Sequence, residues 1–334
     1  MDALLIVEWI IEAFLIIFVL LGGFAYLTLF ERKALARIQV RIGPNRAGPF
    51  GVLQPIADAV KLIFKEELIP TRAYKFIFVL APIITVIPML VILAVVPWGG
   101  NTNILGRQIT LYLADVNVGV LFILSITSIS VYGIVMAGWA SNNKYAMMGG
   151  LRSTAQMISY ELPLGLAFVG PVLIAGSLSL GDIVDAQSPI WFIVYQPIGA
   201  LIFFIAGLAE LNRPPFDMPE AEQELVAGYH VEYSGMKFAL FFMAEYGKMI
   251  VVAFIFTTLF LGGYRGPFID QAPALGPLYV FIKVVIVLFV MIWVRATWPR
   301  IRYDRLMAFG WKVMLPLALA NVFLTAVIMV LIGG

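Results

Sequence analysis

Eight apolar runs of about 20 residues recur along the 334-residue chain and constrain its fold more than any other feature. They cover approximately residues 5–30, 75–97, 116–140, 155–177, 192–210, 237–262, 277–295 and 312–332. A helix rises about 1.5 Å per residue, so each run can cross a hydrocarbon core about 30 Å thick. With 62% hydrophobic residues, the composition excludes an ordinary soluble domain. The sequence predicts an all-α polytopic membrane protein, a single integral membrane domain over residues 1–334 with eight transmembrane helices.

Lysine and arginine are distributed unevenly over the connections between these runs. The odd-numbered connections, counted with their bordering residues, hold 18 of the 22 Lys and Arg residues, and the even-numbered connections hold 2. Because loops rich in Lys and Arg remain cytoplasmic, we expect the odd-numbered connections in the cytoplasm and both termini on the periplasmic face of a bacterial inner membrane or its equivalent. Lys248 and Lys283 fall inside apolar runs, and we expect Lys283 to extend its ammonium group toward the membrane surface.

The chain has no cysteine and one histidine, His230. Thiolate-ligated iron–sulfur clusters and Cys-based zinc sites are therefore excluded within this chain, and one histidine cannot ligate haem on both sides. We expect no metal and no covalently bound cofactor here. Any redox centre should belong to partner proteins. No nucleotide-binding loop and no pairing of a nucleophile with a base is present, and we expect no nucleic-acid partner.

The first connection, residues 31–73, predicts a cytoplasmic loop with an amphipathic helix over 52–66. Gly-Pro pairs mark turns in its first half, where basic residues suit lipid headgroups or an acidic partner surface. One helical face then carries Leu53, Ile56, Val60, Ile63 and Phe64, and the opposite face carries Gln54, Asp58, Lys61 and Lys65. The pattern is typical of a helix lying in the membrane interface, and equally of one packed on a soluble partner.

The fifth connection, residues 211–236, is an acidic loop. It holds Asp217, Glu220, Glu222, Glu224 and Glu232 against Arg213 and the bordering Lys237. Acidic side chains gathered beside a membrane favour a functional role, although a solvated acidic loop is the simpler alternative.

Three further glutamates, Glu161, Glu210 and Glu245, lie in or at the ends of apolar runs. A carboxylate in hydrocarbon is costly, so such residues are functional candidates by default. If the fourth helix starts near Ala155, Glu161 and Glu245 lie about 9 Å and about 12 Å into the membrane from the cytoplasmic side. Similar depths on successive helices favour a hydrated proton path. A pair between Glu245 and Lys248, one turn away, is the structural alternative.

Hydroxyl side chains are frequent in the third apolar run. They are Ser125, Thr127, Ser128, Ser130 and Tyr132. Hydroxyls in membrane helices usually serve helix packing, and we expect these to be packing contacts rather than a proton relay.

Four segments resemble, in the same order, the family of the membrane-embedded H subunit of proton-pumping NADH:quinone oxidoreductase, respiratory complex I, whose mitochondrial counterpart is subunit 1. They are ERKALARIQVRIGPNRAGPFGVLQPIADAVKLIFKE, AELNRPPFDMPEAEQELVAGYHVEYSG, FALFFMAEYGKM and WVRATWPRIRYDRLM. The resemblance runs nearly end to end. His230 departs from it, since the family usually has Asn before Val-Glu-Tyr, and we assign His230 no shared role.

The resemblance implies a subunit that frames a quinone entry tunnel and links quinone reduction to proton translocation. By motif position, the residues near the quinone cavity would be Glu31, Arg32, Arg41, Arg46, Asp58, Arg213, Arg295 and Arg300. The acidic proton path would comprise Glu161, Glu210, Glu245, Asp217, Glu220, Glu222 and Glu224. The first and sixth helices and the amphipathic helix would frame the tunnel.

The resemblance also implies partners. Hydrophilic-arm subunits would carry the flavin, the terminal iron–sulfur cluster and the quinone head-group site. Small membrane subunits, antiporter-like pump subunits and lipids would surround the chain, with quinone as substrate. Two alternatives remain open: the equivalent subunit of a membrane-bound hydrogenase or ferredoxin-linked oxidoreductase, and a stand-alone secondary transporter. The complete motif of the first connection favours the quinone branch. A transporter should show inverted repeats and midplane sites, whereas these acids lie toward one face.

Overall fold

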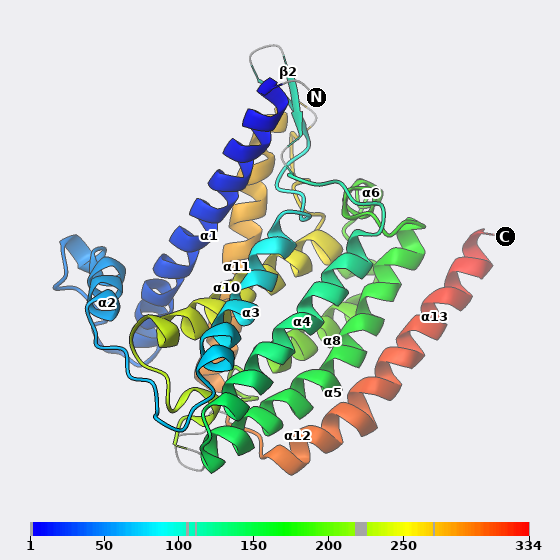
Figure 1. The fold of residues 1–334 in the computed structure, drawn as a ribbon. Helices are drawn as coiled ribbons and strands as arrows, with labels where there is room; N and C mark the ends of the chain where they lie inside the picture. The colour runs from blue at the N-terminus through cyan, green and yellow to red at the C-terminus, as the bar shows by residue number, and fades with distance from the viewer. Residues whose placement is uncertain (1–2, 105–106, 111, 218–225, 270, 334) are drawn as a thin grey trace.

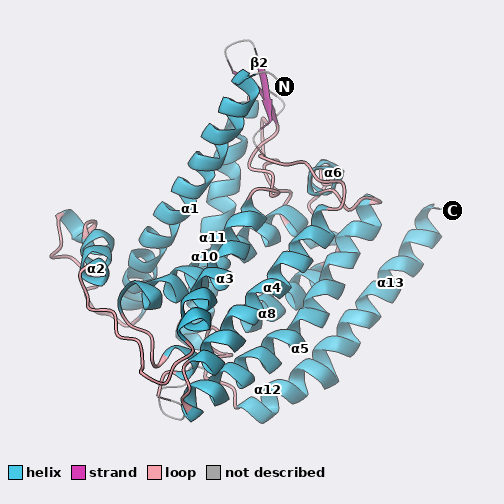
Figure 2. Ribbon diagram, in the orientation of Figure 1, coloured by secondary structure: helices cyan, strands magenta, loops and turns pink. Residues whose placement is uncertain are grey.

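The computed structural model describes residues 3–104, 107–110, 112–217, 226–269 and 271–333, which are mostly helical (Figure 2). The longer helices are α1 (Ala3–Ile38), α3 (Lys75–Leu93), α4 (Gly119–Ala140), α5 (Lys144–Ala175), α8 (Pro197–Glu210), α10 (Gly235–Phe260), α11 (Gly276–Thr297) and α13 (Leu315–Gly333). The shorter elements are η1 (Pro49–Gly51), α2 (Gln54–Ile63), α6 (Leu180–Ala186), α7 (Phe192–Tyr195), η2 (Gly228–His230), η3 (Pro273–Leu275), α12 (Tyr303–Phe309) and the π-helical η4 (Gly310–Met314).

The predicted membrane fold is confirmed. Within the described ranges, seven helical segments are long and apolar enough to cross a membrane, and α8 is a shorter apolar helix preceded by α7. Together they account for the eight predicted runs. The antiparallel pair β1 (Asn101–Ile104) and β2 (Arg107–Thr110), in which Asn101 pairs with Thr110, was not predicted. Strands of four residues are too short to give a clear alternating pattern.

Two helices extend past the predicted apolar runs. Helix α1 continues to Ile38, so Glu31 and Arg32 lie on a helix and not in a loop. Helix α5 starts at Lys144, where the Asn143 side chain caps it by accepting a hydrogen bond from the backbone of Tyr145 at 2.9 Å. The depth predicted for Glu161 assumed a start near Ala155, so that estimate does not hold.

Helix α10 is the centre of the bundle. Every residue from Met249 to Phe260 is buried, and the helix packs against α1, α3 and α11. Beyond α3, the helices α4, α5 and α13 follow side by side (Figure 1). The N- and C-termini lie at the end of the bundle that also carries the β hairpin and α6, which we call the outer end. The end that carries α2 and α12 is called the inner end. Termini at one end agree with an even number of crossings.

Lys283 ties the outer end of α10 to α11. Its Nζ donates hydrogen bonds to the carbonyl oxygens of Leu261 at 2.7 Å, Gly263 at 2.8 Å and Arg265 at 2.6 Å, and lies 4.7 Å from the centroid of the Trp191 ring. The Lys283 ammonium group is therefore buried among backbone carbonyl groups at the outer end. Carbonyl groups left free at the end of a helix provide a nearer partner for the ammonium group.

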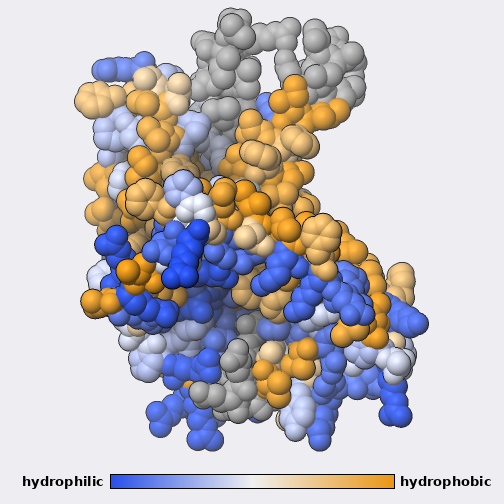
Figure 3. All heavy atoms as spheres, turned by 90° about the vertical axis from the view of Figure 1, so that its left-hand side faces the viewer, coloured by the Kyte–Doolittle hydropathy of each residue, from blue (hydrophilic) through white to orange (hydrophobic). Residues whose placement is uncertain are grey.

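Helix α2 projects from the inner end and packs against α1 and α10 (Figure 1). Its polar side faces α1, where Arg32 Nη1 lies 2.9 Å from Asp58 Oδ2. The apolar face is exposed, with Ile56 55% and Val60 47% accessible. Viewed from this side, apolar side chains gather toward the outer end and hydrophilic ones toward the inner end (Figure 3). An exposed apolar helix face at this boundary needs a membrane or a partner to cover it.

Candidate functional site

Arg213 joins three segments of the chain at the inner end. Its Nη1 donates to both carboxylate oxygens of Glu31 on α1, at 3.0 and 3.2 Å, and its Nε lies 2.5 Å from Glu245 Oε1 on α10. The guanidinium carbon lies 4.1 Å from the centroid of the Tyr246 ring. Glu31 also forms an ion pair with Arg295 on α11. A planar guanidinium can serve two carboxylates and an aromatic face together, which a lysine could not do.

The turn that carries Arg213 is held in place by α5. Gln156 Nε2 donates to the carbonyl oxygens of Ala209 and Phe216, each at 2.8 Å, one on either side of the turn. Asn212 adopts a positive φ of 52° and donates from Nδ2 to Ser153 Oγ at 2.7 Å. These buried hydrogen bonds fix the backbone on both sides of Arg213 and so direct its side chain.

A cavity of about 420 Å³, here called the polar cavity, opens beside this cluster. Its lining comprises Asn212, Arg213, Pro214, Asp217, Ala227, His230, Phe238, Phe242, Glu245, Tyr246, Arg295 and Arg300. Arg300 Nη2 lies 3.0 Å from Asp217 Oδ2 across it. With three arginines and two acids in its wall, the cavity offers N–H donors to a group that accepts hydrogen bonds.

A second cavity, of about 320 Å³, lies between α1, α2 and α10 and is here called the apolar cavity. Its lining comprises Phe24, Ala25, Thr28, Arg32, Pro55, Asp58, Ala59, Lys61, Leu62, Ile63, Met236, Phe238, Ala239, Leu240, Phe242 and Met243. Phe238 and Phe242 line both cavities, so the two cavities adjoin at these rings.

His230 lies in the wall of the polar cavity against two aromatic rings. Its ring centroid is 5.0 Å from that of Tyr229 and 5.6 Å from that of Phe238. Burial disfavours the charged imidazolium and lowers the pKa of His230 to about 4. His230 is therefore neutral at neutral pH and adds no charge to the arginines nearby.

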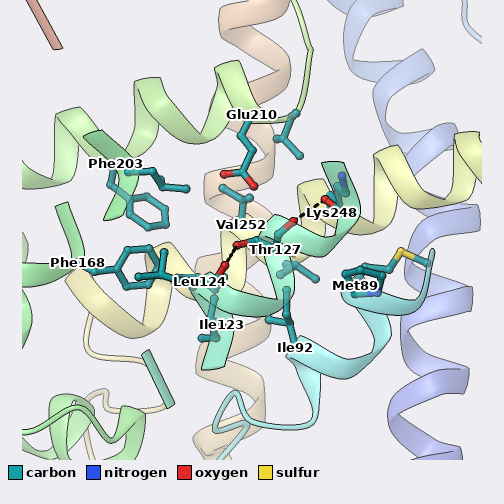
Figure 4. A pocket seen from close by; sticks show the side chains of 16 residues that line it. Met89, Ile92, Ile123, Leu124, Thr127, Phe168, Phe203, Glu210, Lys248 and Val252 are labelled. Atoms are coloured by element: carbon teal, nitrogen blue, oxygen red, sulfur yellow. Dashed lines mark hydrogen bonds between the residues drawn. The ribbon is translucent and has the colours of Figure 1, made fainter. Parts of the chain in front are cut away.

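Glu210 and Lys248 line a small space deeper in the bundle (Figure 4). This space has a volume of about 30 Å³, which is enough to hold a water molecule. The Glu210 carboxylate is directed into it beside Val252, and within the described residues its Oε2 has no hydrogen-bond partner. Since a buried carboxylate oxygen needs a donor, this space suits a single ordered water.

Glu161 reaches α4. Its Oε1 accepts a hydrogen bond from Ser128 Oγ. Ser128 was predicted to serve only in helix packing, and here it touches a predicted site residue. Lys248 lines the same small space as Glu210. In the described structure Glu245 pairs with Arg213, whereas the alternative stated above paired it with Lys248. Glu245, Lys248, Glu210 and Glu161 thus place ionisable side chains on α10, α8 and α5.

The structure brings most of the predicted quinone-cavity residues together. Arg213, Arg295 and Arg300 line the polar cavity, Glu31 bonds to two of them, and Arg32 and Asp58 line the apolar cavity. Arg41 lines a separate cavity of about 660 Å³ with Lys33 and Arg37. Arg46 is exposed and contributes to the lining of none of these described cavities.

The acidic residues are placed in part. Asp217, Glu245, Glu210 and Glu161 occupy the positions given above, and Asp217 is tied to Arg300 rather than freely solvated. Glu220, Glu222 and Glu224 lie outside the described residues. Among the residues that the structure describes, no group of three or more His, Asp or Glu side chains could hold a metal ion.

Sequence reasoning missed three residues that complete the site. Tyr246 carries the Arg213 guanidinium on its ring, Gln156 holds the turn, and Ser128 binds Glu161. Tyr246 directly follows Glu245, but its role depends on the position of Arg213, which is distant in sequence. Gln156 gave a usable signal, since an amide inside an apolar run needs partners.

The fold and site define a multi-pass, mainly helical membrane protein with acidic and basic side chains inside the helix bundle beside two cavities that share lining residues. The sequence model of the family described as NADH dehydrogenase matches residues 11–326. The H subunit of the NADH-quinone oxidoreductase of Protochlamydia amoebophila is 53% identical over 302 residues, 90% of this chain and 91% of that protein. The second of the numbered H subunits of Geobacter sulfurreducens is 53% identical over 311 residues, 93% of each chain.

A third relative, the H subunit of the Thermomicrobium roseum enzyme, is 49% identical over 334 aligned residues, 97% of this chain and 96% of that protein. The chain belongs to the NADH dehydrogenase family, among the H subunits of NADH-quinone oxidoreductases. The resemblance stated from the four sequence segments is therefore confirmed.

Proposed function

We propose that this chain is the membrane subunit of a proton-pumping NADH:quinone oxidoreductase that admits quinone from the bilayer and converts its reduction into proton movement. The observation that carries the proposal is the meeting of the two cavities at Phe238 and Phe242, with an apolar entrance and a charged interior. A quinone has a long apolar tail and a compact head with two carbonyl oxygens, and this pair of cavities suits both parts.

The apolar cavity would hold the tail and the polar cavity would pass the head. Apolar side chains of α1, α2 and α10 surround the first cavity, so a tail gains the burial it would otherwise find in lipid. Arginine N–H groups in the second can donate to carbonyl oxygens. The electrons would come from iron–sulfur clusters and a flavin in hydrophilic-arm partners, which complete the head-group site.

The coupling would be electrostatic. Reduction and protonation of a quinone near Arg213 change the charge balance felt by Glu31 and Glu245, which share that guanidinium. Glu245 and Lys248 are about one turn apart on α10, and Lys248 lines the same small space as Glu210. A change at the cavity is thus passed to Glu210 and Glu161 through adjacent charges. From there the path would lead to small membrane subunits and antiporter-like pump subunits.

Carboxylate-to-amide variants test the proton path in the assembled complex. We expect Glu161→Gln, Glu210→Gln and Glu245→Gln to lose most NADH:quinone turnover and proton pumping in proteoliposomes, because Gln has nearly the same shape but cannot take up or release a proton. Assembly, followed on native gels, should persist. Glu66→Gln, at an exposed position after α2, is the matched control. A Glu161→Gln or Glu210→Gln complex that pumps normally would show that the glutamate is structural.

A bulky substitution tests the entrance. Ala239 lines the apolar cavity, and Ala239→Phe should reduce turnover with a long-tailed quinone several-fold while leaving a tailless quinone less affected. Ala308→Phe, at an exposed position on α12, is the control. Equal turnover of Ala239→Phe and wild type with the long-tailed substrate would contradict the proposed entry route.

A further inference from the structure

The hydroxyl groups of α4 fall into two kinds. Ser125 Oγ donates to the carbonyl oxygen of Leu121 at 2.8 Å, and Thr127 Oγ1 donates to that of Leu124 at 2.9 Å. Ser130 Oγ likewise donates to the carbonyl oxygen of Thr127 at 2.7 Å. These contacts stay within the helix. Ser128 Oγ lies 3.0 Å from the Leu124 carbonyl oxygen and also contacts Glu161 Oε1 on α5.

Ser128 has more acceptors than it can serve. A hydroxyl group carries one hydrogen and can also accept through its lone pairs. Its hydrogen cannot point at Leu124 and at Glu161 at the same time. The bond to an ionised carboxylate is the stronger of the two, because a charged acceptor roughly doubles the strength of a hydrogen bond. The charge on Glu161 therefore decides which acceptor the hydroxyl serves.

We propose that Ser128 is a positioning residue for Glu161, with a hydroxyl that changes its hydrogen-bond acceptor as the carboxyl group gains or loses a proton. When Glu161 is ionised, Ser128 donates to Oε1 and holds the carboxylate against α4. When a proton arrives on Glu161, the hydroxyl hydrogen turns to the Leu124 carbonyl and Oγ accepts from the new O–H. Glu161 gains the one transferred proton, and Ser128 keeps its own.

The exchange gives Glu161 a defined position in both charge states. A carboxylate inside a membrane helix without a donor would be unstable when charged, whereas a neutral carboxyl group without an acceptor would rotate freely. Ser128 supplies both partners from one atom. The Leu124 carbonyl oxygen is shared in this exchange, because Thr127 Oγ1 also donates to it and the Ser128 hydrogen joins that contact at 3.0 Å. The inference rests on the proposed function, in that Glu161 changes its protonation state during turnover.

Three variants of α4 test the inference in the complete complex, reconstituted in proteoliposomes. We expect Ser128→Ala to slow quinone-linked proton pumping about tenfold, the effect of losing one charge-assisted hydrogen bond. Its pH–turnover profile should differ from that of wild type, because Ser128 contacts a group that takes up and releases a proton in the proposed path. Ser128→Thr keeps the hydroxyl and should restore both rate and profile. Ser125→Ala removes a hydroxyl bonded to backbone at an exposed position of the same helix, and should behave as wild type.

The outcomes separate this inference from the proton path. Ser128→Ala with the rate and pH profile of wild type, beside an inactive Glu161→Gln, would overturn the positioning role and leave the path intact. Failure of Ser128→Thr to restore the rate would also overturn the positioning role, because the rate would then not depend on the hydroxyl group at residue 128. A Glu161→Gln complex that pumps normally would instead remove Glu161 from the proposed function. Native gels confirm that each variant is assembled.

Discussion

Arg213 and Glu245 connect the polar cavity to the interior of the helix bundle, with Nε 2.5 Å from Oε1. The arginine belongs to the turn after α8, and the glutamate lies on the central helix α10. Both side chains are largely buried, with 7% and 17% of their surfaces exposed. The same guanidinium also binds Glu31. A change in the charge of either carboxylate therefore alters the strength of the ion pair between Arg213 and the other carboxylate.

Replacing Arg213 tests this connection. We expect Arg213→Met to abolish turnover and to weaken the subunit by about 3–5 kcal/mol, because it leaves buried carboxylates without their cation. Arg213→Lys should also fail to restore turnover, since a single ammonium group cannot reproduce the two-sided contact. NADH:quinone activity and the thermal midpoint of the purified complex measure the two effects.

Arg265 provides the matched control for Arg213. It pairs with Asp185, whose side chain is 57% exposed at the outer end, at 2.7 Å. Exposed ion pairs contribute about 0–1 kcal/mol. Arg265→Met should therefore leave activity and thermal midpoint almost unchanged. An equal loss in both variants would mean that any arginine deletion harms assembly and that the position of Arg213 is not special.

His230 should make the protein sensitive to acid. Its pKa in the folded chain is about 4, below the ordinary value near 6.5, so the unfolded chain binds more protons between these values. The contribution of His230 to the free energy of unfolding is fully present above about pH 6.5. It is lost as the pH falls toward 4, by up to about 3 kcal/mol. His230→Asn removes the titrating group. Its thermal midpoint should fall less than that of wild type between pH 7 and pH 5, and parallel curves would contradict the assignment.

The exposed face of α2 offers a direct test of what covers it. The chain has no cysteine, so Val60→Cys can carry a single environment-sensitive fluorophore, with Lys65→Cys, at an exposed position just after the helix, as the control. We expect blue-shifted emission at residue 60 in membranes that contain the chain without hydrophilic-arm subunits, because apolar side chains enter the lipid interface. A shift that appears only when those subunits are added would assign the face to a protein partner.

Cysteine labelling also tests the orientation predicted from charge. Asn45 lies in the connection after α1, and Ser188 lies between α6 and α7 at the outer end. A membrane-impermeant reagent applied to the cytoplasmic side should label Asn45→Cys and spare Ser188→Cys. Applied to the periplasmic side it should give the reverse pattern. Labelling of Ser188→Cys from the cytoplasm would invert the topology.

The fold could be predicted because hydrocarbon imposes a simple requirement on length and composition. Apolar runs and the distribution of Lys and Arg together indicated the eight crossings and the placement of both termini at one end. The ends of helices were less predictable. Polar residues continue α1 beyond its apolar run and begin α5 before its own run, since a helix that extends out of the membrane needs no apolar residues.

Site residues could be predicted only where burial of a charged side chain in an apolar run is itself energetically unfavourable. Glu161, Glu210 and Glu245 were identified because a charge in an apolar run is expensive. Their partners depend on tertiary packing. Arg213 binds Glu31, 182 positions away, and Ser128 binds Glu161, 33 positions away. The partners of Lys283 likewise depend on tertiary packing, since they are carbonyl groups of residues that follow the end of α10.

The Lys283 contacts also anchor one end of α10. Three carbonyl groups hold its outer end to α11, and Gln187 Nε2 binds the Thr258 carbonyl at 2.8 Å on the same side. At the inner end, α10 begins at Gly235, whose positive φ of 57° marks a bend in the backbone. Side chains thus bind backbone carbonyl groups at the outer end of α10, whereas near its inner end Lys237 forms an ion pair with Glu67. The central helix is therefore fixed to other parts of the chain on both sides of Glu245.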